Sequence, residues 1–341
     1  MSVITLAESG LIPDGLIRMG VRRISRRRLK EEYALTAEQR AQARAQRLAE
    51  WHAGPIAVQT QAANDQHYEV PPAFFDRVLG AHRKYSCCWF DASTSDLDAA
   101  EAKMLEMTAE RAGIVDGMTV LDLGCGWGSF ALWAAGRFPK STIIGVSNSN
   151  PQREFIMDQA RQRGLSNLEI RTCDINDFAP DEKFDRVVSI EMMEHVRNHP
   201  KLFARIATWL KPDGALFTHV FCHKELTYAY EDRGDGDWMA RHFFSGGMMP
   251  SYDLFCGYDR DLDVVQRWWV SGTHYEDTSN AWLERCDAHR KELVEVLGGG
   301  AQGRLRLQRW RMFFLAVAEF FGIDGGEQWG VGHYLLKPKS A

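Results

Sequence analysis

The sequence predicts an α/β fold in which a mostly parallel sheet is covered by helices on both faces. Through the middle of the chain, short apolar stretches alternate with longer stretches of helical periodicity, and this alternation is typical of a parallel sheet. A glycine-rich turn directly follows the first apolar stretch. At 341 residues and 45% hydrophobic residues, the chain is long enough to bury the core of such a sheet together with additional helices.

Seven strands and several helices are expected. The expected strands are residues 119–123, 142–146, 168–172, 186–190, 215–220, 264–270 and 329–336. The expected helices are residues 96–112, 130–138, 151–163, 279–297 and 305–321. Gly298, Gly299 and Gly300 lie between the last two helices, where they suit a hinge or a C-cap.

The same pattern divides the chain into four segments. Residues 1–63 are expected to form a helical extension, with a short helix from Ser9, then a basic segment, then a helix whose N-cap is Thr36. Residues 64–118 are expected to form a cap and a helix that leads into the core. Residues 119–222 are the parallel core, and residues 223–341 supply further cap insertions and the final strands.

A basic cluster lies near the start of a chain whose net charge is −5, a charge that gives no general attraction to nucleic acid. The cluster consists of Arg18, Arg22, Arg23, Arg26, Arg27, Arg28 and Lys30. One interpretation is an amphipathic helix that makes peripheral contact with a membrane. The favoured interpretation is a helix that packs through its apolar side and leaves a basic face in solvent.

The cysteines and the hydropathy indicate a soluble cytoplasmic protein. The seven cysteines include no C-x-x-C pair and no spacing typical of a metal site, so neither a disulfide framework nor a bound metal is expected. No apolar run approaches the roughly twenty residues needed to span a bilayer.

The most informative motif is Asp-Leu-Gly-Cys-Gly-Trp-Gly at residues 122–128, where an apolar strand runs into a turn. Glycines let the backbone approach a ligand closely at the carboxyl edge of a parallel sheet, where such sheets bind nucleotides. The G-x-G-x-G spacing differs from the G-x-G-x-x-G that cradles a pyrophosphate. We therefore expect a ligand without phosphates over Gly124 and Gly126, with Asp122 beside them.

Polar side chains follow the second and third strands. A dinucleotide-binding enzyme usually places an acid after the second strand, whereas here Ser147, Asn148 and Gln152 offer neutral groups that can bind ribose hydroxyls. After the third strand, Asp174 and Ile175 offer a carboxylate and an apolar edge suited to adenine. Taken alone, Asp174 is equally well explained as a loop or capping residue.

Several strings outside the core extend this picture. They are Asp-Gln-His-Tyr-Glu-Val-Pro at residues 65–71, Lys-Tyr-Ser-Cys-Cys-Trp-Phe at residues 84–90, Ser-Ile-Glu-Met-Met-Glu-His at residues 189–195, and shorter strings at residues 10–13, 222–224, 272–275 and 325–329. With the glycine motif, they resemble the cyclopropane-fatty-acyl-phospholipid synthase superfamily, and within it most closely the plant coclaurine N-methyltransferases. The resemblance implies a Rossmann-like class I methyltransferase sheet with helical cap insertions.

The resemblance also implies that the ligand is S-adenosylmethionine and that one product is S-adenosylhomocysteine. Residues 64–118 would then form a lid over this cofactor, with Tyr85 and Ser86 at its methionine end. Gly124 and Gly126 would lie beneath it, Asn148 and Gln152 would hold the ribose, and Asp174 with Ile175 would hold the adenine.

Glu191, Glu194 and His195 are implied to face the methyl acceptor. An amine acceptor is protonated at neutral pH, so two carboxylates and a histidine could hold the ammonium group and accept its proton. If an α-helix starts at Glu191, its side chain shares a face with that of His195. Aromatic rings that could add cation–π attraction are Tyr85, Trp89, Phe243, Phe244, Trp329 and Tyr334.

A rival hypothesis keeps the cofactor and makes the acceptor an unsaturated acyl chain of a lipid. Cyclopropane synthases hold a bicarbonate ion as base, and Cys87, Glu194, His219 and Tyr275 match the positions that hold it. Against this hypothesis, Glu191 stands where those enzymes carry glycine, and a buried carboxylate beside an acyl tail is unfavourable. An amine acceptor is therefore preferred.

A third hypothesis, a non-catalytic nucleotide-binding module, conflicts with the acidic string at residues 191–195. A nucleic-acid substrate is not expected, because the core lacks a basic groove. The sequence leaves open whether the chain forms an oligomer.

Overall fold

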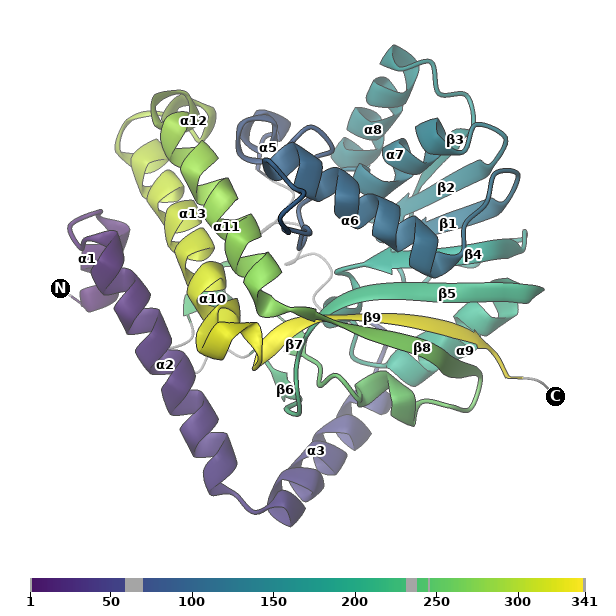
Figure 1. The fold of residues 1–341 in the computed structure, drawn as a ribbon, viewed down its shortest axis with the longest axis horizontal. Coiled ribbons are helices and arrows are strands. Elements are labelled where there is room, and N and C mark those ends of the chain that lie inside the picture. Colours follow the sequence, from purple (N-terminus) through teal and green to yellow (C-terminus); the bar gives the residue numbers. More distant parts are fainter. Residues whose placement is uncertain (1, 59–69, 231–237, 245, 340–341) are drawn as a thin grey trace.

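The computed structural model describes residues 2–58, 70–230, 238–244 and 246–339. Its centre is a seven-stranded sheet in the order β3-β2-β1-β4-β5-β9-β8, in which β1 to β5 are parallel and β9 is antiparallel to both of its neighbours (Figure 1). The strands are β1 Thr119–Leu123, β2 Thr142–Ser147, β3 Leu168–Thr172, β4 Phe184–Ile190, β5 Leu210–His223, β8 Leu262–Ser271 and β9 Trp329–Pro338. All seven predicted strands are confirmed.

Helices cover both faces of the sheet, which explains why all but one residue of β1 and all but one of β2 are buried. On one face, Val120 of β1 packs in a cluster with α6 Leu97–Ala112, α7 Ser129–Arg137 and α8 Asn150–Gln162. On the other face, Leu121 packs in a cluster with α9 His199–Trp209. The strand order reverses on either side of β1, so the loops after β1 and its neighbours meet at one carboxyl edge, where such sheets bind ligands.

The N-terminal residues form three helices, α1 Val3–Glu8, α2 Asp14–Ala34 and α3 Ala37–His52. The predicted N-cap is confirmed, because the Thr36 side chain accepts from the backbone of Gln39 and the Gln39 side chain accepts from the backbone of Thr36. The prediction of a short helix from Ser9 is wrong. That residue ends α1, and α2 begins only after Pro13, whose fixed backbone suits a helix start.

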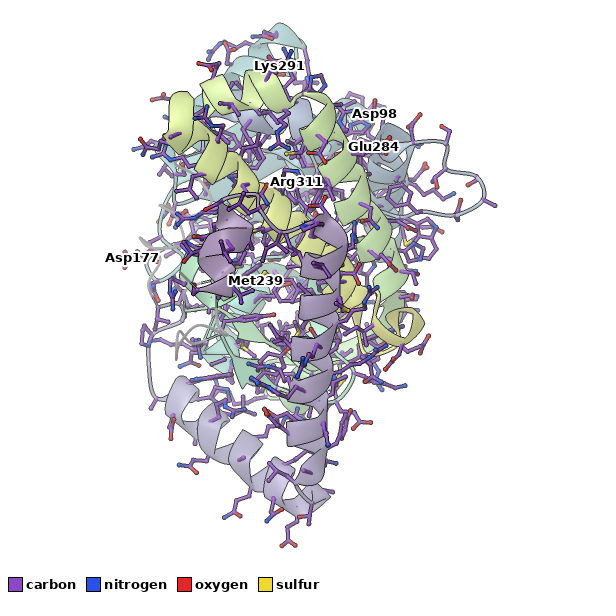
Figure 2. All side chains as sticks on the ribbon, turned by 90° about the vertical axis from the view of Figure 1, so that its left-hand side faces the viewer. Asp98, Asp177, Met239, Glu284, Lys291 and Arg311 are labelled. Carbon is purple, nitrogen blue, oxygen red and sulfur yellow. The ribbon has the colours of Figure 1, made fainter. Side chains whose placement is uncertain are left out.

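The basic cluster belongs to α2, which packs along α13 Gly300–Phe321 (Figure 2). Arg18 and Arg22 both form ion pairs with Glu319 of α13, and the guanidinium of Arg28 lies 4.4 Å from the centre of the Tyr228 ring. Arg311 of α13 also pairs with Asp14 at the start of α2. Part of the cluster therefore holds the extension to the cap, in line with the packing interpretation of this segment.

The cap is a helical layer over the site edge, made of α11 Gly272–Ala288, α12 Arg290–Val296 and α13. The helix expected at residues 279–297 is in fact two helices, the first of which begins directly after β8. Gly298, Gly299 and Gly300 all have positive φ and lie at the junction of α12 and α13, so the predicted connection between two helices is found there. The smaller elements are α5 Pro72–Val78, β6 Tyr228–Ala229, α10 Trp238–His242, β7 Met248–Met249 and the 3-10 turns Met193–His195, Leu254–Gly257 and Ile323–Gly326.

Residues 65–69 of the string at residues 65–71 lie outside the described residues, so the expectation for them stays a prediction. Within the part of the chain that is described, no helix has both the length and the apolar character needed to cross a bilayer.

Gly272 joins β8 to α11 in a space that no side chain could share. A Cβ there would lie 2.1 Å from the carbonyl oxygen of Trp329 and 2.2 Å from that of Phe321. We expect Gly272→Ala to lower the free energy of unfolding by about 3 kcal/mol, because rigid backbone atoms would have to move. Thermal and denaturant unfolding would measure this loss. Gly15→Ala in α2 is the matched control, since a Cβ there meets nothing within 4 Å; equal stability of the two variants would contradict the prediction.

Candidate active site

The glycine turn after β1 is built from residues with positive φ: 85° at Gly124, 51° at Gly126 and 80° at Gly128. A Cβ on Gly124 would lie 2.6 Å from the Met192 side chain, and one on Gly128 would lie 2.7 Å from Ile156. A Cβ on Gly126 would meet nothing within 4 Å. The outer glycines are thus required by packing, whereas Gly126 faces open space at the carboxyl edge of the sheet.

Two adjoining cavities open at this turn and share Gly124, Gly126 and His195 in their walls. One, of about 90 Å³, lies over the ends of β1, β2 and β3 and is called here the sheet-edge cavity. The other, of about 110 Å³, is called the aromatic cavity. Its ring-bearing lining residues are Tyr85, Trp127, Phe130, Phe221, Phe244, Tyr275, Trp282 and Phe313.

The predicted cofactor residues gather around these cavities. Ser147, Asn148, Gln152 and Ile175 line the sheet-edge cavity, and Tyr85, Ser86 and Asp122 line the aromatic cavity. Asp174 lines neither; its Oδ1 atom accepts hydrogen bonds from the backbone and side chain of Asn176. A contact between Asp174 and adenine therefore stays a prediction.

Buried polar atoms in both walls lack a hydrogen-bond partner among the described residues. In the aromatic cavity they include Asp122 Oδ2, Trp127 Nε1, Ser129 Oγ and Trp282 Nε1, and in the sheet-edge cavity the atom is Gln152 Nε2. Burial also raises the pKa of Asp122 to about 7. Unsatisfied buried groups are unfavourable, so these walls are suited to a ligand that carries both donors and acceptors.

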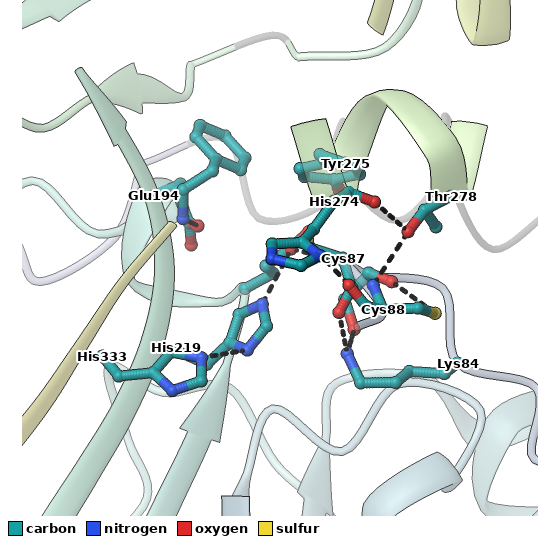
Figure 3. Close-up of polar contacts among 12 residues, drawn as sticks. Lys84, Cys87, Cys88, Glu194, His219, His274, Tyr275, Thr278 and His333 are labelled. Atoms are coloured by element: carbon teal, nitrogen blue, oxygen red, sulfur yellow. Dashed lines mark hydrogen bonds and ion pairs between the residues drawn. The ribbon is translucent and has the colours of Figure 1, made fainter. Parts of the chain in front are cut away.

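Glu191 is the centre of the predicted acceptor site. Its Oε1 atom accepts from the Cys87 backbone N–H at 3.0 Å and lies 3.2 Å from His219 Nε2, and its Oε2 atom accepts from the Tyr275 hydroxyl at 2.7 Å. Figure 3 shows Cys87, His219 and Tyr275 converging from three separate segments. The structure thus brings together residues of the loop before α6, of β5 and of α11, as predicted.

No α-helix begins at Glu191, so the condition under which Glu191 and His195 would share a helical face is not met. Glu191 has a φ of 47°, a left-handed conformation that is strained for a residue with a side chain, and only the short 3-10 turn Met193–His195 follows. Its backbone N–H donates to the His219 carbonyl at 2.7 Å, which continues the pairing of β4 with β5. Glu191 and His195 nevertheless both line the aromatic cavity.

The two carboxylates of the string differ in their surroundings. Burial raises the pKa of Glu191 above its usual value, and the charge of Lys84, the Tyr275 hydroxyl and the Cys87 N–H offset only part of this rise. Burial and the nearby charge of Glu191 raise the pKa of Glu194 well above its usual range. Glu194 lies behind the cavities and accepts from the backbone N–H of Phe221 at 2.6 Å. When one of the two carboxyls is ionised, the arrangement therefore favours Glu191 as the ionised one and Glu194 as the protonated one.

His195 is the predicted catalytic residue that lines both cavities. Burial lowers its pKa to about 4, so the imidazole is neutral at physiological pH. Its ring stacks on that of Phe244, with the two planes 12° apart. A neutral imidazole at this junction can form a hydrogen bond with a methyl-accepting molecule in the aromatic cavity.

Among the predicted aromatic rings, Tyr85 and Phe244 line the aromatic cavity. The others have packing roles: Phe243 stacks on Phe313, Trp329 donates to the Tyr228 hydroxyl, Tyr334 donates to the Tyr252 carbonyl, and Trp89 stacks on His274.

Sequence reasoning missed Lys84, Trp282 and Phe313. Lys84 is 1% exposed, and its ammonium donates to Ser86 Oγ and to the Cys87 carbonyl, so it holds the loop from which the Cys87 N–H donates to Glu191 (Figure 3). The string at residues 84–90 contained this lysine, but nothing in it indicated burial. Trp282 and Phe313 lie on predicted helices, whose periodicity could not tell which apolar residues face a cavity.

Known proteins resemble this chain over most of its length. The family model described as mycolic acid cyclopropane synthetase matches residues 57–325. An (S)-coclaurine N-methyltransferase from Thalictrum flavum subsp. glaucum is 37% identical over 339 residues, which cover 97% of this chain and 94% of that protein. A cyclopropane-fatty-acyl-phospholipid synthase from Escherichia coli (strain K12) is 33% identical over 233 residues, which cover 67% of this chain and 58% of that protein.

A solved structure agrees with these matches. The crystal structure of a coclaurine N-methyltransferase bound to N-methylheliamine and S-adenosylhomocysteine matches the present fold with a TM-score of 0.94. Its sequence is 34% identical, and the match covers 98% of both chains.

The open space at Gly126 gives a direct test of the cofactor site. We expect Gly126→Val to weaken binding of S-adenosylhomocysteine at least about 100-fold, because the new side chain would project into space that both cavities share. Isothermal titration calorimetry would measure the affinity. Gly164→Val is the control for backbone strain, since Gly164 has a φ of 67° and equally open space but lines neither cavity. Unchanged affinity in Gly126→Val would contradict this placement of the cofactor.

Proposed function

This chain belongs to the mycolic acid cyclopropane synthetase family, and we propose that it N-methylates a small-molecule amine by transferring the methyl group of S-adenosylmethionine. It is an S-adenosylmethionine-dependent methyltransferase with the class I methyltransferase fold. The nature of the acceptor is argued from the surroundings of Glu191.

The walls of the two cavities fit S-adenosylmethionine. Gln152 is oriented by Ser147, whose hydroxyl donates to Gln152 Oε1 at 2.5 Å, so its Nε2 atom remains as a donor toward a ribose. Asp122 and Ser129 would hold the methionine end, with Gly126 beneath it. When bound, this cofactor supplies an electrophilic methyl group on a positively charged sulfur.

The observation that supports an amine acceptor is the position of the Glu191 carboxylate. It accepts hydrogen bonds from Cys87 and Tyr275 and lies 3.2 Å from His219. These are positions that, by resemblance, would hold the bicarbonate ion of a cyclopropane synthase. A carboxylate attached to the chain thus takes the contacts that a free bicarbonate would make, and bicarbonate is not part of the proposed reaction.

The charge of an ionised Glu191 also favours an amine acceptor. An ionised Glu191 at the wall of a cavity would be unfavourable beside an acyl chain, but it would stabilise an ammonium group. In the proposed reaction Glu191 holds the protonated amine and accepts its proton, which frees the nitrogen lone pair for attack on the methyl carbon. His195 stays neutral and helps to orient the amine. Tyr85 and Phe244 can add cation–π attraction of about 0.5–2 kcal/mol each.

The acceptor can be identified with methyl-labelled S-adenosylmethionine. One arm would offer a panel of benzylisoquinoline and simple aryl-alkyl amines, and the other would offer phospholipid vesicles with unsaturated chains. We expect label in amines and none in lipid, because Glu191 supplies a base for an ammonium group. Labelled lipid without labelled amine would overturn the proposal and would favour contact of α2 with a membrane.

Replacement of Glu191 tests its role in that reaction. We expect Glu191→Gln to lower kcat/KM for the amine at least about 100-fold, since the amide cannot accept the proton, while affinity for S-adenosylhomocysteine is retained. Glu284→Gln on the exposed side of α11 is the control and should keep wild-type turnover. Unchanged turnover in Glu191→Gln would remove this carboxylate from the mechanism.

A further inference from the structure

A line of hydrogen-bonding side chains runs from Glu191 to the last turn of α6. His219 Nε2 lies 3.2 Å from Glu191 Oε1, His333 Nε2 lies 2.9 Å from His219 Nδ1, and Arg111 NH1 lies 2.6 Å from His333 Nδ1. The two histidines are direct partners on the paired strands β5 and β9, and Figure 3 shows the bond between them. Both are 0% exposed.

The arginine at the far end fixes the direction of every bond in this line. A guanidinium has only donors, so His333 Nδ1 must be the acceptor. A neutral imidazole carries a single N–H, so the proton of His333 is on Nε2, which donates to His219 Nδ1. The proton of His219 is then on Nε2 and points at Glu191. Arg111 therefore determines that Glu191 receives a hydrogen bond at this oxygen.

The electrostatics of the two rings agree with this assignment. Burial lowers the pKa of both His219 and His333 far below the usual value, and the nearby charges of Lys84 and Arg111 lower both further. Neutral rings are what the directional argument requires. A protonated His333 would direct an N–H at the guanidinium of Arg111.

We propose that Arg111 and His333 are positioning residues that hold His219 as a hydrogen-bond donor to Glu191 and so keep Glu191 an ionised acceptor for the protonated amine. This inference rests on the proposed function and assigns a role to two residues outside both cavities. Because arginine does not accept a proton, the line does not carry the proton of the amine to solvent. Instead, it fixes which nitrogen of each ring carries the proton. We call this line of Arg111, His333 and His219 the lock.

Loss of the lock would permit the opposite arrangement. With no donor facing His333 Nδ1, both rings can change tautomer, so that Glu191 carries a proton and donates it to His219 Nε2. A neutral carboxyl is favoured by burial, so the pKa of Glu191 would rise. Since the ionised form is the active one, the acidic limb of the pH profile would move to higher pH, and activity lost at neutral pH would return in more alkaline solution.

Other charges near the line are common to wild type and variants. The titratable groups around Glu191, from the elements that pack against it, are Lys84, Cys87, Glu194, His195, His219 and Tyr275. Those around Arg111 are Glu110, Tyr252 and His333. A shift seen only when Arg111 is changed can thus be assigned to the lock.

The test compares Arg111→Met with Arg111→Lys, in which the ammonium is again only a donor. We expect the acidic limb of kcat/KM to rise by about one pH unit in Arg111→Met and by less in Arg111→Lys, with unchanged affinity for S-adenosylhomocysteine. Arg186→Met is the matched control, since Arg186 is also half-buried but donates to the carbonyls of Ala112, Asp185 and Asp213. It should lose stability without a shift of the limb.

An infrared pH titration gives a readout that does not depend on turnover. The band of a protonated carboxyl that disappears in Glu191→Gln and remains in Glu194→Gln belongs to Glu191, and it should be visible at neutral pH in Arg111→Met and absent in wild type. If no amine is methylated but this band behaves as expected, the proposed function fails and the lock stands. Wild-type pH behaviour of the band in Arg111→Met would overturn the lock, even if that variant melts at a lower temperature.

Discussion

A buried carboxylate that the proposed reaction requires in its ionised form is the constraint around which the site is built. Glu191 can carry its charge in a water-poor environment only because donors reach it from separate parts of the chain. The Cys87 loop, β5 and α11 each supply one of them, and Lys84 adds a positive charge nearby. The positions of these elements are therefore linked, since displacement of any one would leave the charge poorly compensated.

The sheet and the cap supply different walls of the two cavities. The carboxyl edge of β1 and β2 provides a rigid floor, with a glycine turn that leaves space for a nucleoside. The cap helices α11 and α13 supply Trp282 and Phe313 to the aromatic cavity. Since the two cavities meet at Gly124, Gly126 and His195, a cofactor on the floor and an acceptor under the cap would come together at one point.

The sequence predicted those features that depend on local pattern. The strands follow from short apolar runs, the turn from its glycines, and the convergence on Glu191 from strings that resemble a known family. Other features depend on contacts between distant segments and leave no local signal. The positive φ of Glu191 arises from pairing of β4 with β5, the burial of Lys84 from packing around its loop, and the link between Arg111 and His333 joins residues 222 positions apart. Asp174 shows that a residue type suited to a ligand can also accept hydrogen bonds within its own turn, so its contact with adenine stays a prediction.

The place of β9 in the sheet has a consequence for biosynthesis. This strand is inserted between β5 and β8, although it leaves the ribosome after every other strand of the sheet. Until it is inserted, β5 and β8 each expose an unpaired edge, which is prone to association with other chains. His333 belongs to this strand. The hydrogen bond between His333 and His219 therefore forms only when β9 completes the sheet. A nascent chain that stalls before β9 would be both inactive and exposed to aggregation.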